Sequence, residues 1–411
     1  VFDSRGNPTV EAEVTLKDGS IGSAIVPSGA STGRYEAHEL RDKNKDYLNK
    51  SVFDAVENIN VKIFEALKDK DSRNQNKIDK ILIDLDGTEN KSNIGANAIL
   101  AVSIANLKAA AKSEKKEIYK FIKHEEKSKT DFFTPYPLMN IINGGAHANN
   151  SLEIQEFMIR PDGAKSFTQA IKMSFLVINN LRTILKKLNL STSVGDEGGF
   201  APMIGSNTQA LNFITKAIRM SGFKNGKDIS ICLDVAANEL FKKNKYSIHS
   251  KSYISVDKSI TEYKKIIKKY KIKSIEDPFA ENDWRAWNKL MKSIKKIQIV
   301  GDDLYVTNLE RLKKGFLNIS SNSILIKLNQ IGTVSETLDV IKFAQTIGYK
   351  TIISHRSGDS EDTFIADLAV GTNSSQIKTG SLARSERVAK YNQLIRIEEE
   401  LGKKARMNNI N

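Results

Sequence analysis

Short apolar runs, each ending in a polar or charged cluster, recur along the second part of the chain. Helical stretches separate them, and their Lys residues alternate with inward-facing Ile, as in Lys264–Lys269. The runs are Ile229–Leu233, Ile272–Ile275, Ile297–Val300, Ile324–Ile326, Thr351–Ile353 and Gln376–Ile377. Repetition of strand, polar end and helix is typical of a parallel (β/α) barrel. Functional side chains of such a barrel lie at the C-terminal ends of its strands, where these polar clusters stand.

The first part of the chain has a different pattern. Thr9–Leu16 alternates between polar and apolar positions, and Ile21–Val26 predicts a second, returning strand. Helices are expected over about Val52–Leu67 and Gly95–Lys112, and the second is apolar on most sides, which indicates burial. This mixture predicts a small α+β unit ahead of the barrel.

A break between the two patterns falls at Thr134-Pro135-Tyr136-Pro137, because proline interrupts helices and central strands. We therefore expect an α/β protein of two domains. The smaller N-terminal α+β domain covers residues 1–130, and a catalytic (β/α)8-type barrel domain covers residues 131–411.

Composition excludes several classes of protein. The 411 residues are 40% hydrophobic and 27% charged, which is typical of a globular chain with a large core. The single cysteine, Cys232, excludes a disulfide framework and indicates a reducing compartment. No run approaches the roughly 18–20 apolar residues of a transmembrane helix. We expect a cytoplasmic protein without a membrane partner.

The net charge of +14 has two interpretations. It is typical either of a protein that binds nucleic acid or of one with many solvated lysines. We interpret the Lys excess as spread over the whole chain and not gathered in one patch, and we find no helix-turn-helix, zinc finger or stacked-aromatic RNA motif. We therefore favour solvated surface over nucleic acid as the primary partner.

Three carboxylates stand directly after three successive apolar runs: Asp234, Glu276 and Asp302. Closure of the barrel brings them to one mouth, where they form an all-oxygen site for a hard divalent cation, with Mg²⁺ fitting better than Ca²⁺. For any one of these acids, a helix N-cap or a surface charge is the simpler interpretation. Three at equivalent positions favour the metal site.

Basic residues follow the later strands. Lys327 and Lys378 stand at strand ends, where they serve either to bind an anion or as a general base. Arg356, between His355 and Ser357, is typical of an anion clamp for phosphate or carboxylate, although a plain polar loop has the same composition.

Glycine-rich loops supply further candidates. Glu197 stands next to glycine in Gly195–Gly199, and His147 ends a Gly-Gly-Ala-His segment; both loops allow close approach to a ligand. Glu153–Phe157 alternates and presents Gln155 or Glu156 at a strand end. Ser28–Gly33 is small and Gly-rich, as in a mobile lid. Ordinary turns are the alternative for each loop, and no nucleotide-binding fingerprint is present.

Many of these segments together resemble the enolase family over essentially the whole chain. The matching stretches are Asp3–Glu11, Ser28–Gly33, Gly195–Phe200, Leu233–Ala236, Glu276–Pro278, Gly301–Leu304, Lys327–Thr333, Ser354–Gly358, Lys378–Gly380, Arg384–Arg387 and Ala389–Gln393. The resemblance implies a barrel whose first units depart from regular β/α alternation. It also implies reversible dehydration of 2-phospho-D-glycerate to phosphoenolpyruvate in glycolysis, through an enediolate intermediate.

The resemblance also implies roles for individual residues. Lys327 is similar to the family's base and Glu197 to its acid, with Glu156 in support. The ligands of a first Mg²⁺ would be Asp234, Glu276 and Asp302, and Ser31 would ligate a second Mg²⁺ that binds with the substrate. The substrate-binding residues would be His147, Gln155, His355, Arg356, Ser357 and Lys378.

Partners and alternatives complete the set of expectations. Glu11 and Arg396 stand where the family pairs an acid with an arginine across a homodimer. An acid-sugar dehydratase or cycloisomerase on the same scaffold is the alternative enzyme, although such enzymes lack the Ser28–Gly33 lid. A second role in an RNA-processing or cell-surface complex, with a secondary cell-surface or secreted pool, stays open.

Overall fold

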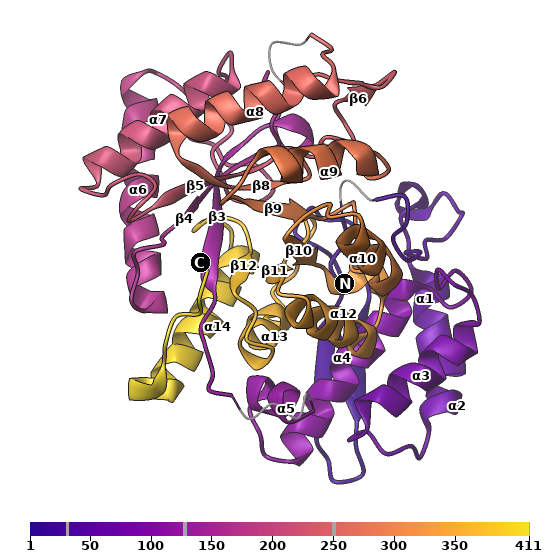
Figure 1. Cartoon of the computed structure of the whole chain (residues 1–411). Helices are drawn as coiled ribbons and strands as arrows, with labels where there is room; N and C mark the ends of the chain where they lie inside the picture. The colour runs from indigo at the N-terminus through magenta and orange to yellow at the C-terminus, as the bar shows by residue number, and fades with distance from the viewer. Residues whose placement is uncertain (30–32, 126–129, 249–251, 411) are drawn as a thin grey trace.

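A computed structural model describes residues 1–29, 33–125, 130–248 and 252–410. Eight strands close into a barrel in the order β10-β11-β12-β3-β4-β5-β8-β9 (Figure 1). The strands are β3 (Tyr136–Asn143), β4 (Glu156–Arg160), β5 (Ser230–Asp234), β8 (Ile272–Glu276), β9 (Gln298–Gly301), β10 (Ser323–Ile326), β11 (Lys350–Ser354) and β12 (Gln376–Lys378). All six apolar runs expected as strands therefore become barrel strands, within one residue or so at each end.

One strand runs against the others. β4 pairs antiparallel with both β3 and β5, whereas all other neighbouring strands of the barrel are parallel. The expected irregular first units are thereby confirmed. Because β4 is reversed, its first residue, Glu156, lies opposite Asp234 at the last position of β5. The strand begins at Glu156, which confirms that the Glu153–Phe157 segment presents Glu156 at a strand end.

Helices surround the barrel, and side-chain caps mark where six of them begin. The side chains of Ser166, Ser206, Ser255, Asp283, Asn308 and Thr333 each accept a backbone N–H at a helix start. The helices are α6 (Phe167–Lys187), α7 (Asn207–Met220), α8 (Val256–Tyr270), α9 (Trp284–Ser293), α10 (Leu309–Leu317), α11 (Leu328–Ile331), α12 (Val334–Thr346), α13 (Phe364–Gly371) and α14 (Ser385–Leu401). A small hairpin, β6 (Phe241–Lys242) and β7 (Lys245–Tyr246), precedes α8.

The barrel interior is a packed apolar layer. It contains Leu138, Met158, Cys232, Val300, Leu325 and Ile352, all at most 2% exposed and each from a different strand. Side chains alternate along a strand, so these residues fill the barrel while their sequence neighbours pack against the helices. Burial raises the pKa of the Cys232 thiol to about 12, which makes it an inert core residue.

The N-terminal part pairs β1 (Glu11–Thr15) with β2 (Ile21–Ile25) in an antiparallel hairpin. The buried helix α4 (Ala96–Ser113) packs on it so closely that a Cβ at Gly22 would lie 2.2 Å from the Ala105 carbonyl oxygen. The helix expected over Val52–Leu67 is instead α1 (Phe53–Asn58) and α2 (Phe64–Leu67), joined by a π-helical turn. α3 (Gln75–Asp86) and α5 (Ile118–Glu125) complete this part.

Two sets of contacts dock the N-terminal part on the barrel. Ser28 exchanges backbone hydrogen bonds with Gly358 in the loop after β11, at 2.7 and 2.9 Å. Asp79 of α3 accepts the backbone N–H of Ser335 in α12 at 2.8 Å. The first contact places the segment that leads into Ser28–Gly33 at the C-terminal end of the barrel strands, where the predicted site lies.

Candidate functional site

Strand ends of the barrel and the loops that follow them surround one cavity whose lining is mostly polar and charged. Its walls include nearly every site residue expected from the sequence. These are His147, Gln155, Glu156, Glu197, Asp234, Asp302, Lys327, His355, Arg356, Ser357 and Lys378. Glu276 joins them through Lys378, as described next. Ser31 lies outside the described residues.

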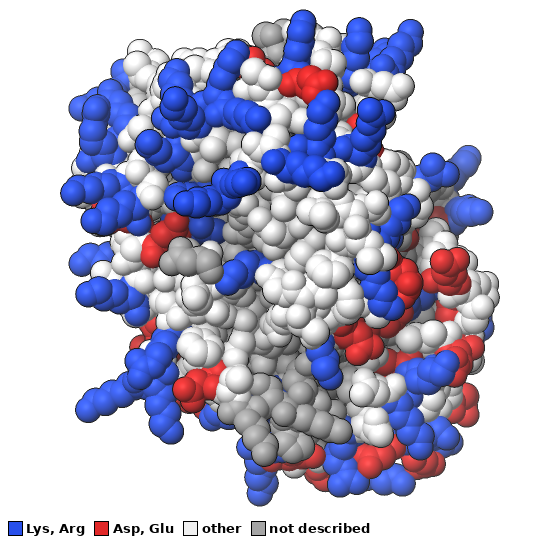
Figure 2. Space-filling view, in the orientation of Figure 1, with Lys and Arg blue, Asp and Glu red and all other residues white. Residues whose placement is uncertain are grey.

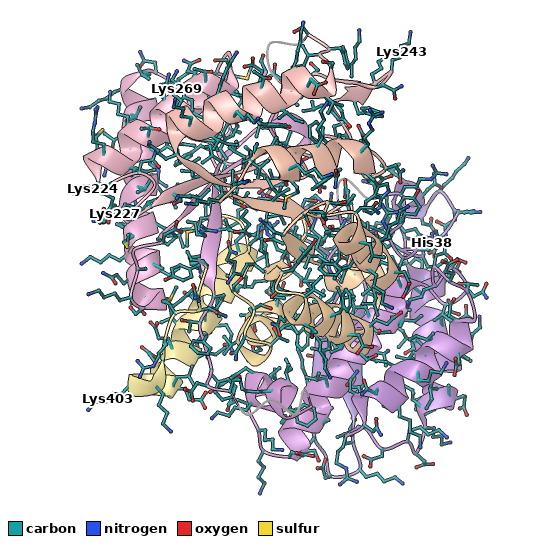
Figure 3. The ribbon with its side chains drawn as sticks, viewed as in Figure 1. His38, Lys224, Lys227, Lys243, Lys269 and Lys403 are labelled. Carbon is teal, nitrogen blue, oxygen red and sulfur yellow. The ribbon has the colours of Figure 1, made fainter. Side chains whose placement is uncertain are left out.

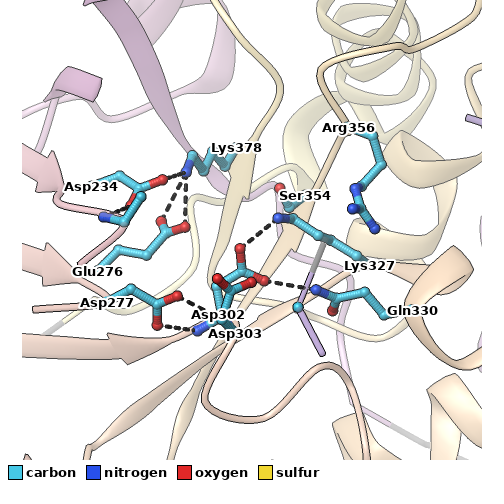
Figure 4. A network of polar contacts seen from close by, with 12 residues as sticks. Asp234, Glu276, Asp277, Asp302, Asp303, Lys327, Gln330, Ser354, Arg356 and Lys378 are labelled. Carbon is cyan, nitrogen blue, oxygen red and sulfur yellow. Dashed lines mark hydrogen bonds and ion pairs between the residues drawn. The ribbon is translucent and has the colours of Figure 1, made fainter. Parts of the chain in front are cut away.

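Lys378, the last residue of β12, points across the mouth to the acids of β5 and β8 (Figure 4). Its Nζ lies 2.9 Å from Asp234 Oδ2 and 2.9 Å from both Glu276 oxygens, and 3.3 Å from Glu156 Oε1. Burial alone would lower the pKa of Lys378, but these carboxylates hold it well above its usual value. Burial raises the pKa of Glu276, and the neighbouring Asp234 raises it further. The ammonium thus compensates charge that the acids would otherwise leave unpaired.

Lys327 follows β10 and makes an equivalent contact with Asp302, after β9. Its Nζ lies 2.5 Å from Asp302 Oδ2, and Gln330 Nε2 donates to Asp302 Oδ1 at 2.9 Å (Figure 4). Asp277 supports this arrangement from below, because its two oxygens accept the backbone N–H groups of Asp302 and Asp303 at 2.9 and 2.8 Å. Asp302 is therefore fixed on both sides, and its remaining neighbour is the Lys327 amine.

Two more carboxylates line the cavity: Glu156 at the start of the reversed strand β4, and Glu197 in the loop between α6 and α7. Glu197 lies 3.6 Å from His147 Nδ1 and 3.6 Å from His355 Nε2, and Asn140 of β3 donates to it at 3.1 Å. Burial alone would raise the pKa of Glu197, but both imidazoles and Lys378 lower it well below its usual value. For Glu156 the pKa is instead raised, by burial first and then by the Glu197 charge. Within one cavity, Glu156 therefore binds a proton more tightly than an ordinary glutamate, and Glu197 binds one less tightly.

Several buried polar atoms of this wall have no hydrogen-bond partner among the residues that the structure describes. They are His147 Nδ1, Gln155 Oε1, Glu156 Oε2 and His355 Nε2. Buried polar groups are almost always hydrogen-bonded, so a row of such atoms around one cavity indicates a polar ligand. These atoms of the wall are therefore available to hydrogen-bond a ligand bound in the cavity.

Arg356 lies on the side of the cavity toward the N-terminal part. Glu36 binds it through both carboxylate oxygens, at 2.8 and 3.2 Å, and also accepts the Gly33 N–H at 2.9 Å. Asn329 accepts a further hydrogen bond from Arg356 at 2.9 Å. Both described ends of the Ser28–Gly33 segment are thus joined to the Arg356 region, one through Gly358 and the other through Glu36.

The donor set fits a divalent cation. Six acids line the cavity, Glu156, Glu197, Asp234, Asp277, Asp302 and Asp303, against three permanent cations, Lys327, Arg356 and Lys378. The excess of negative charge and the hard oxygen donors favour Mg²⁺. Among the described residues, the oxygens of Asp277, Asp302 and Asp303 lie within 4.8 Å of one another, as do the donor atoms of His147, Glu156 and Glu197. Asp234 and Glu276 belong to neither group, since Lys378 binds both.

Sequence reasoning did not identify some members of this site. Asp277 and Asp303 each adjoin a predicted ligand, so the doubled acids after β8 and β9 were the available signal. Asn329 and Gln330 lie in the segment just after Lys327, beyond Leu328. Glu36 gave no signal, because it lies in a polar segment of the N-terminal part and reaches the site only through the docking of the two parts.

Comparisons with known proteins agree with this geometry. The model of the enolase C-terminal TIM barrel domain matches residues 131–411, and that of the enolase N-terminal domain matches residues 1–122. The chain belongs to the enolase family. A protein described as enolase from Pelagibacter ubique (strain HTCC1062) is 71% identical over 411 residues, which are 100% of this chain and 97% of that protein.

Membership of the enolase family makes the protein a lyase of glycolysis, a phosphopyruvate hydratase. The fold expected from the resemblance, a barrel with a smaller N-terminal part, is confirmed. Among the described residues, no helix is both long and apolar enough to span a bilayer.

Proposed function

We propose that the chain converts 2-phospho-D-glycerate reversibly to phosphoenolpyruvate and water through an enediolate intermediate, with Lys327 as the base and Glu197 as the acid. The observation that carries this proposal is an amine and a carboxyl group on different sides of one cavity. Lys327 follows β10, whereas Glu197 contacts His147 and Asn140 of β3, three places away in the strand order. Removal of a proton from one face and of a hydroxyl from the other needs such a separation.

In the first step, the amine of Lys327 takes the C2 proton of the substrate. The amine must be neutral to act as a base, whereas contact with Asp302 raises the pKa of Lys327 in spite of its burial. The base is therefore free to act only when Asp302 is engaged elsewhere, which links the binding of a cation at Asp302 to the readiness of Lys327.

In the second step, Glu197 gives a proton to the departing C3 hydroxyl. The raised pKa of Glu156 and the lowered pKa of Glu197 support a pair that holds one proton between them. We assign Glu156 the role of proton reserve and Glu197 that of proton donor, with His147 between them at 3.7 and 3.6 Å.

Substrate anions bind to the basic side of the cavity. Arg356 with Ser357 supplies a guanidinium and a hydroxyl for one anionic group, and the partnerless atoms of His147, Gln155 and His355 supply further polar contacts. Lys378 contributes positive charge at the opposite wall. These residues hold the substrate between the base and the acid.

Mg²⁺ binds, in this proposal, through Asp234, Glu276 and Asp302, and a second Mg²⁺ binds with the substrate at Ser31. When bound, the cations supply electrostatic stabilisation of the negative charge that develops on the substrate carboxylate. The acid excess of the cavity supports this assignment. Asp277 is a poorer ligand, because both of its oxygens already accept backbone N–H groups.

The deciding experiment is an ultraviolet assay of phosphoenolpyruvate formation from 2-phosphoglycerate, with and without Mg²⁺. Activity that chelation abolishes and Mg²⁺ restores is the expected result. Sugar acids serve as the control substrates, since dehydration of a sugar acid without activity on 2-phosphoglycerate would assign the chain to the alternative enzyme on this scaffold.

At the level of the molecule, we propose two domains divided between residues 130 and 131, a homodimer and a cytoplasmic location. The gap between the two family matches, after residue 122 and before residue 131, supports the boundary. Glu11 and Arg396 are both exposed, as a pair that meets across an interface requires.

A further inference from the structure

Positive charge is concentrated on one part of the molecule. Residues 205–300 contain 20 Lys and Arg and 9 Asp and Glu, a difference of +11 out of the chain's +14. Figure 2 shows lysine and arginine side chains gathered over the end of the molecule that carries α7, α8 and α9, whereas the N-terminal part carries both signs. This corrects the expectation of an evenly spread excess.

Part of this charge forms a basic belt, which we define as Lys224, Lys227, Lys271, Lys273, Lys295 and Lys296. They lie before β5 and β9 and around the start of β8, so they lie at the end of the barrel opposite the catalytic mouth. All six are exposed, and no ion pair joins any of them to an acid among the described residues.

Contacts between loops make the belt continuous. Asn225 donates to the Tyr270 carbonyl oxygen at 2.8 Å, which joins the segment of Lys224 and Lys227 to the end of α8 beside Lys271. In Figure 3, Lys224, Lys227 and Lys269 lie on this same side of the molecule. Ser274 of β8 pairs with Gln298 of β9, which brings Lys273 next to the segment of Lys295 and Lys296.

An apolar tip adjoins the belt in the α10–β10 loop. Leu317 is 80% exposed and Ile319 is 55% exposed. Asn322 of this loop donates to the Ile297 carbonyl oxygen at 2.9 Å, so the tip and the last two lysines of the belt belong to neighbouring loops. Two large aliphatic side chains exposed in one short segment form an apolar patch that a partner can cover.

The backbone at the tip strengthens this interpretation. Ile319, the residue after the C-cap of α10, has φ 51°, a left-handed conformation that is costly for a β-branched residue and that glycine normally occupies. Its N–H bonds to the Phe316 carbonyl oxygen at 3.0 Å, as in an ordinary helix end. A glycine at position 319 would allow the same helix end. The fold alone therefore gives no reason for an exposed isoleucine there.

We propose, in place of the expectation of no membrane partner, that this end of the barrel docks on a membrane surface that carries anionic headgroups. The basic belt lies against the headgroups, and Leu317 and Ile319 enter the apolar edge of the bilayer. A lipid surface fits better than nucleic acid, because base stacking requires a free aromatic face. The tip itself is aliphatic, and the neighbouring Phe316, 42% exposed, is held in an edge contact with Tyr349, with ring centroids 6.3 Å apart. The catalytic mouth lies at the opposite end and stays open.

The test is co-sedimentation of the full chain with vesicles of phosphatidylcholine alone and with vesicles that also contain phosphatidylglycerol. Binding to the second kind only, weakening as salt rises, is expected. Leu317→Ser/Ile319→Gly keeps every charge and should weaken binding at least about tenfold. Lys271→Gln/Lys273→Gln/Lys295→Gln/Lys296→Gln should weaken it by about 600-fold, at roughly fivefold per lysine.

The matched control removes the same charge elsewhere. Lys43→Gln/Lys45→Gln/Lys403→Gln/Lys404→Gln alters four exposed lysines away from the belt and should bind vesicles nearly as the unaltered chain does. Phosphoenolpyruvate formation should be unchanged in all variants, which verifies that each is folded. Three results would each overturn the proposal: no binding to anionic vesicles at physiological salt, an equal loss in the control, or tighter binding of single-stranded RNA that the tip variant leaves intact.

Discussion

The proposed base, Lys327, and the proposed acid, Glu197, line one cavity but interact with different neighbours. Lys327 interacts with Asp302, which we assign to the cation, whereas Glu197 interacts with two imidazoles and with Glu156 through His147. Each group can therefore be removed without removing the environment of the other. Proton transfer by one such side chain contributes typically about 10²–10⁴-fold to a rate.

The first prediction separates the two proton transfers. Lys327→Ala should lose both phosphoenolpyruvate formation and exchange of the C2 proton with D₂O, because no other amine lies on that side of the cavity at Asp302. Glu197→Gln should lose product formation by about 10²-fold or more but keep C2 exchange, since the base remains. Nuclear magnetic resonance of 2-phosphoglycerate in D₂O with Mg²⁺ measures both.

Two outcomes would count against these roles. Exchange by Lys327→Ala at the unaltered rate would move the base to Lys378. Complete loss of exchange in a folded, Mg²⁺-binding Glu197→Gln would show that the two residues do not act in separate steps.

The second prediction concerns Asp302 as a ligand. Asp302→Ala should weaken Mg²⁺ binding in calorimetry and remove most activity, because it deletes one hard oxygen donor and the partner of Lys327. Asp339→Ala, at an exposed position, is the control and should change neither. Unchanged Mg²⁺ affinity in Asp302→Ala would shift the assignment to another group, with His147, Glu156 and Glu197 the first candidate.

Between elements, a buried carboxylate joins α3 to α12. Asp79 accepts hydrogen bonds from Gln75 at 2.9 Å, Ser103 at 2.6 Å and the Ser335 N–H at 2.8 Å. α12 follows the short helix α11 that begins directly after Lys327. The contact thus fixes the segment behind the base from the N-terminal part.

The third prediction tests this contact. Every partner of Asp79 is a donor, so Asp79→Asn loses at least one hydrogen bond and should lower the free energy of unfolding by about 1–3 kcal/mol. Asp84→Asn, exposed on the same helix, should change it by at most about 0.5 kcal/mol. Thermal unfolding of both variants beside the unaltered chain measures the effect.

The same contact gives a dependence on pH. Burial raises the pKa of Asp79 to about 6, so the folded chain binds more protons than the unfolded chain between about pH 4 and that value. Stability from this group is therefore present at the acidic end of the window and is lost as the pH rises through it. The stability of Asp79→Asn does not fall with pH in this way. The difference in free energy of unfolding between the unaltered chain and Asp79→Asn should therefore be largest near the acidic end and should become smaller as the pH rises. A difference that does not change with pH would contradict the assignment.

On the scale of the whole molecule, the fourth prediction concerns assembly. Glu11 on β1 and Arg396 on α14 are exposed and come from the two ends of the chain. If they pair across a dimer, Arg396→Glu should raise the dimer dissociation constant in sedimentation velocity, by repulsion of like charges. Glu11→Lys combined with Arg396→Glu should restore the dimer. Failure of the double variant to recover would exclude this pair from the interface.

The sequence by itself determined the barrel and most of its mouth. Six strands were predictable because each is a short apolar run followed by a polar cluster. A parallel strand is buried on both faces and is therefore apolar along its length, whichever strands lie beside it. Asp234, Glu276, Asp302, Lys327 and Lys378 were predictable because residues at the ends of parallel strands meet at one end of a closed barrel, whatever the loops do.

Tertiary structure decided what depends on contacts between distant segments. The reversal of β4, which brings Glu156 opposite Asp234, follows from packing and leaves no trace in an alternating pattern. Glu36 reaches Arg356 only because the two parts dock, and Lys224 joins Lys273 in one belt only because neighbouring strands align. Hydrophobic periodicity reports which face of an element is buried, but not which other element covers it.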